Sequence, residues 1–264
     1  MENFYLALGL TIFAGLSTGV GSLTAFLSKK FNPKFLAASL GFSAGVMIYV
    51  SFMEIMVKAN EELTAIYGVS KGEILTVLSF FGGILMIGLI DRFVPSPENP
   101  HEIKNPDTLT NQDKEKKLMR MGLFSALAIG IHNFPEGLAT FVAALDDPQT
   151  GISIAIAIAI HNIPEGIAVS IPVYYATKNR KKAFALSFAS GLAEPIGALV
   201  GYLVLITFFG DGFLGFVFAG VAGVMIYISL DELLPTAEEY GEHHVAIYGL
   251  ISGMAIMALS LLIL

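Results

Sequence analysis

The chain alternates long apolar runs with short polar connections, and this alternation is the feature that most constrains its fold. A helix that crosses the hydrocarbon core of a bilayer needs about 20 consecutive apolar residues. Because only 14% of the residues are charged, against roughly a quarter in soluble domains, the sequence predicts an all-α integral membrane protein with eight transmembrane helices. The eight runs lie at about 4–28, 35–57, 73–95, 119–144, 150–176, 183–209, 212–234 and 244–263.

The distribution of Lys and Arg predicts how the helices are oriented. Thirteen of the 15 basic residues lie in the connections between runs 1 and 2, 3 and 4, and 5 and 6. Basic residues accumulate on the cytoplasmic side, so both termini are predicted outside the cell. The connection between runs 7 and 8 is an exception, because it lacks Lys and Arg and contains Glu238, Glu239, Glu242, His243 and His244.

A single domain covering 1–264 accounts for the whole chain. We expect helices 1–3 in 1–95, helices 4–5 in 118–176 and helices 6–8 in 177–264. The intervening stretch 96–117 combines several prolines with mixed charges, which is typical of a flexible cytoplasmic loop.

A seven-residue word occurs twice within these apolar runs, as HNFPEGL at 132–138 and HNIPEGI at 161–167. On a helix, the first and fifth residues of each word share one face and the second residue flanks them. Ionisable and amide side chains are expensive inside a membrane and usually mark a functional site. These side chains are His132, Asn133 and Glu136 in the first word, and His161, Asn162 and Glu165 in the second.

The residue types of the two words indicate a metal site. Glu194, beside a proline in the sixth run, adds a third intramembrane carboxylate. The chain has no cysteine, so bound metal must use imidazole, amide, carboxylate or thioether ligands, which suit Zn(II), Fe(II), Mn(II) or Co(II) better than Cu(I). Two imidazoles, two amides and three carboxylates can surround two divalent ions, with Glu136 and Glu165 bridging them. Pro135 and Pro164 are expected to kink the helices beside these ligands.

Three further pairs of segments repeat along the chain. Residues 45–54 in run 2 return as 223–232 in run 7, and 15–21 in run 1 resembles 191–197 in run 6. Residues 65–68, before run 3, return as 246–249 at run 8. Because runs 1 and 6 are predicted to cross in opposite directions, the pattern predicts a 3+2+3 inverted repeat. Secondary transporters commonly have this arrangement, with the substrate bound near the midplane.

Several other residues have two interpretations. The methionines Met47 and Met225 either pack or bind metal. Glu54 and Glu232 either extend toward the membrane surface or act as a relay or gate. The histidine pair at 243–244 either begins a solvated helix or collects metal on the cytoplasmic side.

The paired His-Asn-x-Pro-Glu-Gly words closely resemble those of the ZIP (Zrt/Irt-like) family of metal transporters, and the chain is similar to its bacterial zinc-uptake members over nearly its full length. The resemblance implies a binuclear metal centre in the inner membrane of a prokaryote, possible homodimers and movement of one helix set against the other. Its implied ligands are His132, Asn133, Glu136, His161, Asn162, Glu165 and Glu194, with Met47 capping the centre and Met225, Asp231 and Glu232 marking the cytosolic exit.

Uptake of divalent metal into the cytoplasm is therefore the leading functional prediction. We expect Zn(II), Fe(II), Mn(II), Co(II) and Cd(II) as transported ions, no cofactor, no enzymatic activity and no nucleic-acid partner. The alternative is an intramembrane metallohydrolase that activates a metal-bound water. Against this alternative, the sequence has no His-Glu-x-x-His motif, and inverted duplication has no evident use in hydrolysis. A metal-gated sensor would need a soluble output domain, which the sequence lacks.

Overall fold

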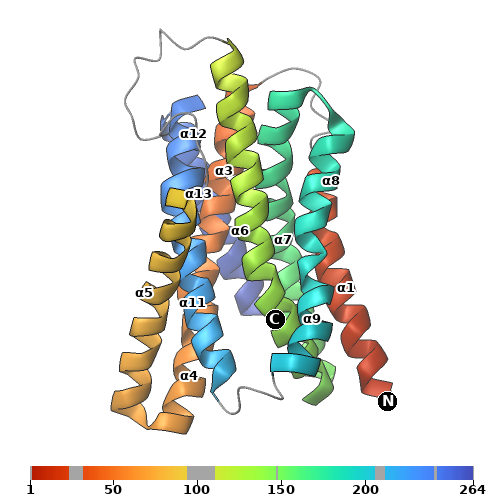
Figure 1. The fold of residues 1–264 in the computed structure, drawn as a ribbon, viewed down its shortest axis with the longest axis vertical. Coiled ribbons are helices and arrows are strands. Elements are labelled where there is room, and N and C mark those ends of the chain that lie inside the picture. Colours follow the sequence, from red (N-terminus) through yellow and green to blue (C-terminus); the bar gives the residue numbers. More distant parts are fainter. Residues whose placement is uncertain are drawn as a thin grey trace.

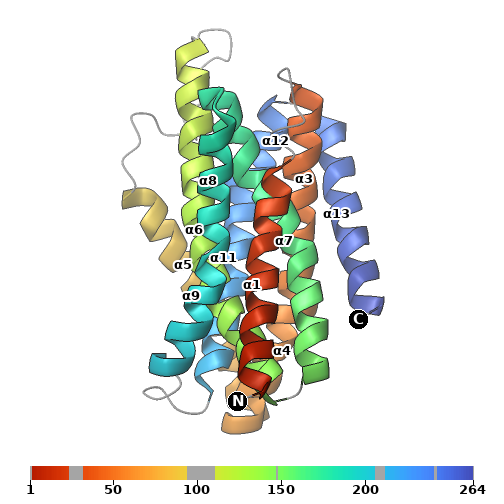
Figure 2. The same ribbon diagram turned by 90° about the vertical axis from the view of Figure 1, so that its right-hand side faces the viewer.

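The computed structural model describes residues 2–23, 32–93, 111–146, 148–205, 212–240 and 243–263. Every regular element in these ranges is helical, which confirms the all-α class. The helices run along one common direction and form an elongated bundle (Figures 1 and 2). The N-terminus lies at the end of the bundle where α6 meets α7, and we call this end the N-terminal end (Figure 1).

The elements of the first half are α1 (Glu2–Ser22), α3 (Pro33–Val50), the π-helix η1 (Ser51–Ile55), α4 (Met56–Tyr67), α5 (Val69–Phe93) and α6 (Asn111–Asp146). The second half contains α7 (Pro148–Thr177), α8 (Arg180–Gly191), α9 (Ala193–Val200), η3 (Gly201–Leu205), α11 (Phe213–Ile228), η4 (Ser229–Leu233), α12 (Leu234–Tyr240) and α13 (His243–Ile263).

Seven helical stretches of the described residues are long and apolar enough to cross a membrane. The helix α6 is the predicted fourth crossing but is not among these seven. Its first ten residues are rich in charge, and the first word places His, Asn, Pro and Glu within its apolar part. The count of eight crossings therefore stays a prediction.

One predicted boundary is wrong. The loop expected over 96–117 ends earlier, because α6 begins at Asn111. The last part of the expected loop, 111–117, is rich in Lys, Glu and Gln, which are strong helix formers and extend the helix beyond its apolar part. Residues 94–110 lie outside the described ranges.

The helices pack into two groups. The first group contains α1, α6, α7, α8 and α9, in which α7 packs closely against both α1 and α6. The second contains α3, α4, α5, α11, α12 and α13, with α13 against α3 and α5 against α11. The two groups meet mainly where α3 packs on α7 and α11 packs on α6, so the words on α6 and α7 lie beside this junction.

The two repeated segments of runs 2 and 7 contain a π-helix at the same position. Each begins at a buried serine, Ser51 or Ser229, whose hydroxyl donates to the carbonyl of the methionine four residues earlier. These hydrogen bonds are 2.6 Å long to Met47 and 2.8 Å long to Met225. A π-helix inserts one extra residue into a turn and often lies near a functional site. The sequence repeat thus corresponds to a shared local distortion that hydropathy alone did not predict.

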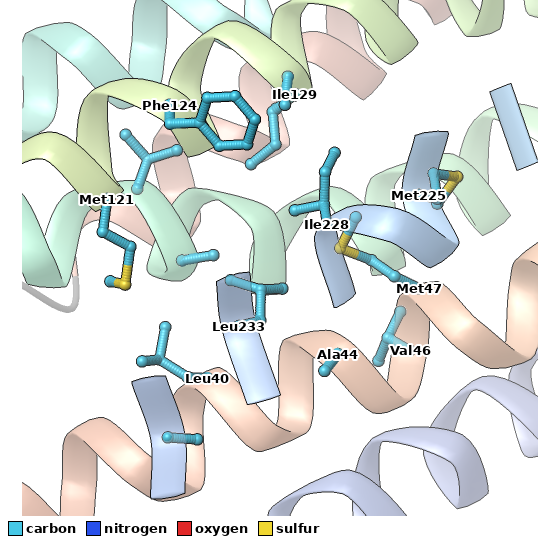
Figure 3. Close-up of a cluster of buried hydrophobic side chains, with 14 of the residues drawn as sticks. Leu40, Ala44, Val46, Met47, Met121, Phe124, Ile129, Met225, Ile228 and Leu233 are labelled. Atoms are coloured by element: carbon cyan, nitrogen blue, oxygen red, sulfur yellow. The ribbon is translucent and has the colours of Figure 1, made fainter. Parts of the chain in front are cut away.

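The main buried cluster joins the two groups. Met47 and Met225 belong to this cluster, and both are fully buried (Figure 3). Its other members include Leu40 and Leu233 from the second group, and Phe124 from α6. The packing interpretation of the two methionines is therefore satisfied in this structure, and metal binding by them stays a prediction.

Candidate metal centre

Both words lie on continuous helices. The first word is inside α6 and the second is inside α7, and each helix runs through its proline, Pro135 or Pro164. The side chains of His132 and His161 are outside the described part of the structure, so metal binding by these two residues stays a prediction. The expected kinks also stay predictions.

Close backbone contacts hold each word against a neighbouring helix. A methyl group on Gly197 of α9 would overlap the carbonyl oxygen of Phe134, in the first word. A methyl group on Gly21 of α1 would likewise overlap the carbonyl oxygen of Ile163, the matching position of the second word. Glycine permits this approach because it has no side chain, as is common between membrane helices.

The glycine at the end of each word makes the converse contact. Gly137 lies against the carbonyl oxygen of Glu194, and Gly166 lies against that of Thr18. Phe134 and Ile163 are 29 residues apart, as are Gly137 and Gly166. Their partners Gly21 and Gly197, and Thr18 and Glu194, are each 176 residues apart. The four contacts are thus paired in the order that the sequence repeats predict.

Glu194 meets the second word directly. It lies in the first turn of α9 and is fully buried. The side-chain amide of Asn162 donates to Glu194 Oε1, and also to the backbone oxygen of Ala14 on α1 at 2.9 Å. These contacts join α7, α9 and α1, so the structure brings together two residues that are 32 positions apart in the sequence.

Asn133, in the first word, uses its amide in a similar way. It is fully buried, and its Nδ2 donates to the backbone oxygen of Ser190 on α8 at 3.4 Å. Both asparagines therefore direct their N–H groups toward protein acceptors. Their side-chain oxygens are left for another partner.

Three buried oxygens in this region receive no hydrogen bond from the described residues. They are Asn133 Oδ1, Asn162 Oδ1 and Glu194 Oε2. Buried polar atoms nearly always have a partner, so each of these oxygens calls for one. An amide oxygen and an ionised carboxylate only accept hydrogen bonds, and a cation can occupy the same position as a donor. The region is therefore suited to positive charge.

Two more buried carboxylates interact with Glu194. Glu136 is 4% exposed, Glu165 is fully buried, and both interact electrostatically with Glu194. Carboxylates that interact in an apolar interior repel one another, and bound cations would offset this repulsion. The described side chains contain no group of three His, Cys, Asp or Glu residues close enough to hold one ion. Binuclear geometry is accordingly still a prediction.

A cavity of about 360 Å³ includes Glu136 in its lining and lies between the parts of α4, α6, α7 and α11 near the N-terminal end of the bundle. Its walls come from both helix groups and are largely apolar. Three charged residues line it, namely Glu136 from α6, Glu54 from η1 and Lys58 from α4. Its apolar walls include Ala139 and Ala143 of α6, Ile154 and Ile158 of α7, and Leu214 and Phe218 of α11.

The predicted exit residues lie toward the opposite end of the bundle. Asp231 and Glu232 are in η4, and Glu232 is 7% exposed. The side chain of Asp231 is hydrogen-bonded to Tyr227, whose hydroxyl also lies 3.5 Å from Asp91 Oδ2. Asp91 in turn pairs with Arg120 on α6 at 3.3 Å.

Sequence reasoning missed part of this polar network. The signal was available for Asp91, which interrupts the third apolar run near its end. No sequence pattern indicates that Tyr227 and Arg120 would meet it, because this contact depends on how α5, α6 and α11 pack.

A hydrogen bond links α12 to the first residue of α13. His243 Nδ1 lies 2.8 Å from Glu238 Oε1, and both side chains are largely exposed. This contact is compatible with a solvated start of α13. Collection of metal at this position stays a prediction.

A bundle of apolar helices that buries oxygen atoms suited to cations, and in which the carboxylate residue Glu136 lines a cavity, has the general form of an ion transporter. Comparison with known proteins gives the family. A sequence profile of the ZIP zinc transporter family matches residues 92–261, which is more than half of the chain. The chain belongs to this family, as the repeated words predicted.

Relatives match over the full chain. A protein named zinc transporter ZupT from Chlorobium chlorochromatii (strain CaD3) is 65% identical over 264 residues, covering 99% of this chain and 98% of the relative. ZupT from Lysinibacillus sphaericus (strain C3-41) is 60% identical over 265 residues, with 99% and 98% covered. ZupT from Oceanobacillus iheyensis is 60% identical over 267 residues, with both chains fully covered.

These findings, with the seven apolar helices, establish a multi-pass membrane protein of a transporter family. They favour transport over hydrolysis, because the relatives are named as transporters and the family profile is that of a transporter.

Proposed function

We propose that this protein carries Zn(II) into the cytoplasm through a binuclear site between α6, α7 and α9. The ZupT relatives are named for zinc, and the donor types here suit Zn(II) together with Fe(II), Mn(II), Co(II) and Cd(II). The proposed ligands are His132, Asn133, Glu136, His161, Asn162, Glu165 and Glu194.

One observation carries the proposal. The buried oxygens Asn133 Oδ1, Asn162 Oδ1 and Glu194 Oε2 have no donor among the described residues, and Glu136 and Glu165 interact electrostatically with Glu194. Hydrogen bonds to Ser190 and Ala14 fix both amide groups so that their oxygens are available to a cation. A binding role accounts for this orientation, whereas a purely structural role leaves the oxygens without a partner.

Charge balance supports the binding of divalent ions at this site. Two divalent ions beside three carboxylates leave a net charge of about +1, whereas the same carboxylates without metal carry three negative charges in an apolar interior. One ion would leave a net charge of about −1, so charge balance is met equally well by one ion or two, and the choice of two rests on the paired words and the family resemblance. Glu136 and Glu165 occupy the same position in the two words, so they are the natural bridging ligands.

The cavity at the N-terminal end provides an entrance to Glu136, and Asp231 and Glu232 lie toward an exit at the other end. In the proposed orientation, eight helices cross the inner membrane and both termini are outside. A homodimer is proposed from the family resemblance alone. The paired glycine contacts and the two matching π-helices support a 3+2+3 inverted repeat. Such a repeat would let the two helix groups alternate access to the site.

Uptake into liposomes tests the proposal. The purified protein should move radioactive zinc into sealed vesicles, and Glu136→Ala should reduce the rate to that of empty vesicles. Glu73→Ala is the matched control, because Glu73 is exposed in the first turns of α5, away from the cavity. Zinc uptake that survives in Glu136→Ala at the wild-type rate would overturn the proposal.

A further inference from the structure

The cavity that reaches Glu136 already contains a cationic side chain. Lys58 Nζ lies 2.7 Å from Glu54 Oε1, and both residues line the cavity. The side chain of Glu54 is 18% exposed, whereas that of Lys58 is 43% exposed. The carboxylate is thus set back in the cavity wall, with the more accessible ammonium group beside it.

The position of the pair distinguishes it from an ordinary surface pair. Glu and Lys four residues apart on a solvated helix stabilise it by only about 0.3–0.5 kcal/mol. Here the pair spans η1 and α4 and faces the same space as Glu136, between walls that are otherwise mostly apolar. Lys58 is also one of only two basic residues on the predicted outer side, the other being Lys71.

We infer that Lys58 acts as a built-in competitor for the incoming metal and sets the apparent affinity of uptake. This inference rests on the proposed function, because it concerns the ion's route to Glu136. While the pair is closed, the ammonium group neutralises Glu54. An arriving divalent cation displaces Lys58 from Glu54, is held briefly by that carboxylate and then passes to Glu136.

The charges that line the cavity determine whether removal of Lys58 raises or lowers the apparent affinity for the metal ion. Glu54, Lys58 and Glu136 together carry a formal charge of −1 when both carboxylates are ionised, and removal of Lys58 changes it to −2. A divalent ion is then attracted more strongly and has no ammonium group to displace. Removal of Glu54 has the opposite effect, because the charge of Lys58 then faces the ion without compensation.

Initial rates of zinc uptake into proteoliposomes test this role. Lys58→Gln should lower the KM for zinc by about three- to tenfold at low ionic strength, and this difference should shrink as salt is added. The kcat at saturating zinc should stay within about twofold of wild type, because the site between α6, α7 and α9 is unchanged. Glu54→Gln should raise the KM.

Two variants serve as controls. Lys58→Arg keeps the charge and can still pair with Glu54, so its KM should match that of wild type. Lys71→Gln removes the same charge from the same predicted side, but Lys71 is exposed in the first turn of α5 and does not line the cavity. Its KM should also match wild type, which separates a local effect from a general change in surface charge. Rates are compared per reconstituted protein, so poor folding of one variant lowers kcat rather than KM.

The outcomes are distinguishable. If wild type takes up zinc and both Lys58→Gln and Lys71→Gln have the wild-type KM, the inference is overturned and the proposed function stays intact. An equal fall in KM in both variants would also overturn it, because the effect would be one of surface charge. Absence of any zinc uptake by wild type would overturn the proposed function, and the inference with it.

Discussion

The contact between Gly197 and the backbone of α6 gives the sharpest test of how the site is held together. A methyl group at this position would overlap the carbonyl oxygen of Phe134, one residue before Pro135. Backbone atoms cannot rotate away as a side chain can. In Gly197→Ala, α9 and α6 must therefore separate by about 1 Å or more to restore van der Waals contact.

This separation has two calculable effects. Overpacking of a tight interface typically destabilises a protein by about 1–3 kcal/mol. For a chain of this length, that change corresponds to a fall in the melting temperature of about 2–5 °C. Because Glu194 lies less than one turn before Gly197, its carboxylate moves with α9 away from Glu136. A displacement of about 1 Å can reduce a rate about 100-fold where positioning matters, so we expect uptake to fall more than stability does.

Gly82→Ala is the matched control for this experiment. Gly82 also lies within an apolar helix, α5, but a methyl group there would meet no atom within 4 Å. Thermal unfolding in detergent and zinc uptake into proteoliposomes would be measured on both variants. The reasoning would be refuted if Gly197→Ala kept the melting temperature and uptake rate of Gly82→Ala.

Three further predictions concern the site and its orientation. Asn162→Leu removes the amide that donates to Glu194 and to the backbone oxygen of Ala14, so it should lower the free energy of unfolding by about 2–4 kcal/mol. It should also abolish zinc binding measured by calorimetry, and unchanged binding would contradict the ligand role of Asn162. Chelation of bound zinc should lower the melting temperature of the wild-type protein. Zinc at 100 times the wild-type Kd should raise its free energy of unfolding by about 2.7 kcal/mol. An equal rise in Glu194→Gln at the same zinc concentration would argue against this carboxylate as a ligand. Because the chain has no cysteine, Lys71→Cys should react in intact cells with a membrane-impermeant maleimide and Lys181→Cys should not; the reverse labelling would invert the proposed orientation.

The sequence predicted the class of fold and the helices that carry the two words, because both depend on local patterns. Apolar runs of sufficient length leave few alternatives to membrane helices. The start of α6 was missed because hydropathy marks only the membrane-crossing part of a helix, whereas Asn111 begins a polar extension of it. The π-helices at Ser51 and Ser229 were also missed, since one extra residue in a turn barely changes the hydrophobic pattern.

The candidate site could be predicted only as a set of residue types. Helical spacing places Asn133 and Asn162 beside the carboxylates, but it gives no information on which atom of each amide faces the site. The hydrogen bonds that their Nδ2 groups donate to the backbone oxygens of Ser190 and Ala14 depend on the packing of α8 and α1, which lie far away in the sequence. The Glu54–Lys58 pair has a recognisable spacing, yet its place in the cavity also depends on α6, α7 and α11.

The extra residue in η1 determines the direction in which α4 presents its side chains. Each residue of an α-helix turns the chain by about 100°, so one inserted residue rotates everything that follows by that angle relative to α3. The cavity-lining position of Lys58 depends on this rotation. Deletion of Phe52, whose side chain is exposed, would restore a regular helix and turn the lysine toward a different neighbour. The register of a single helical turn therefore determines which charge an approaching ion encounters.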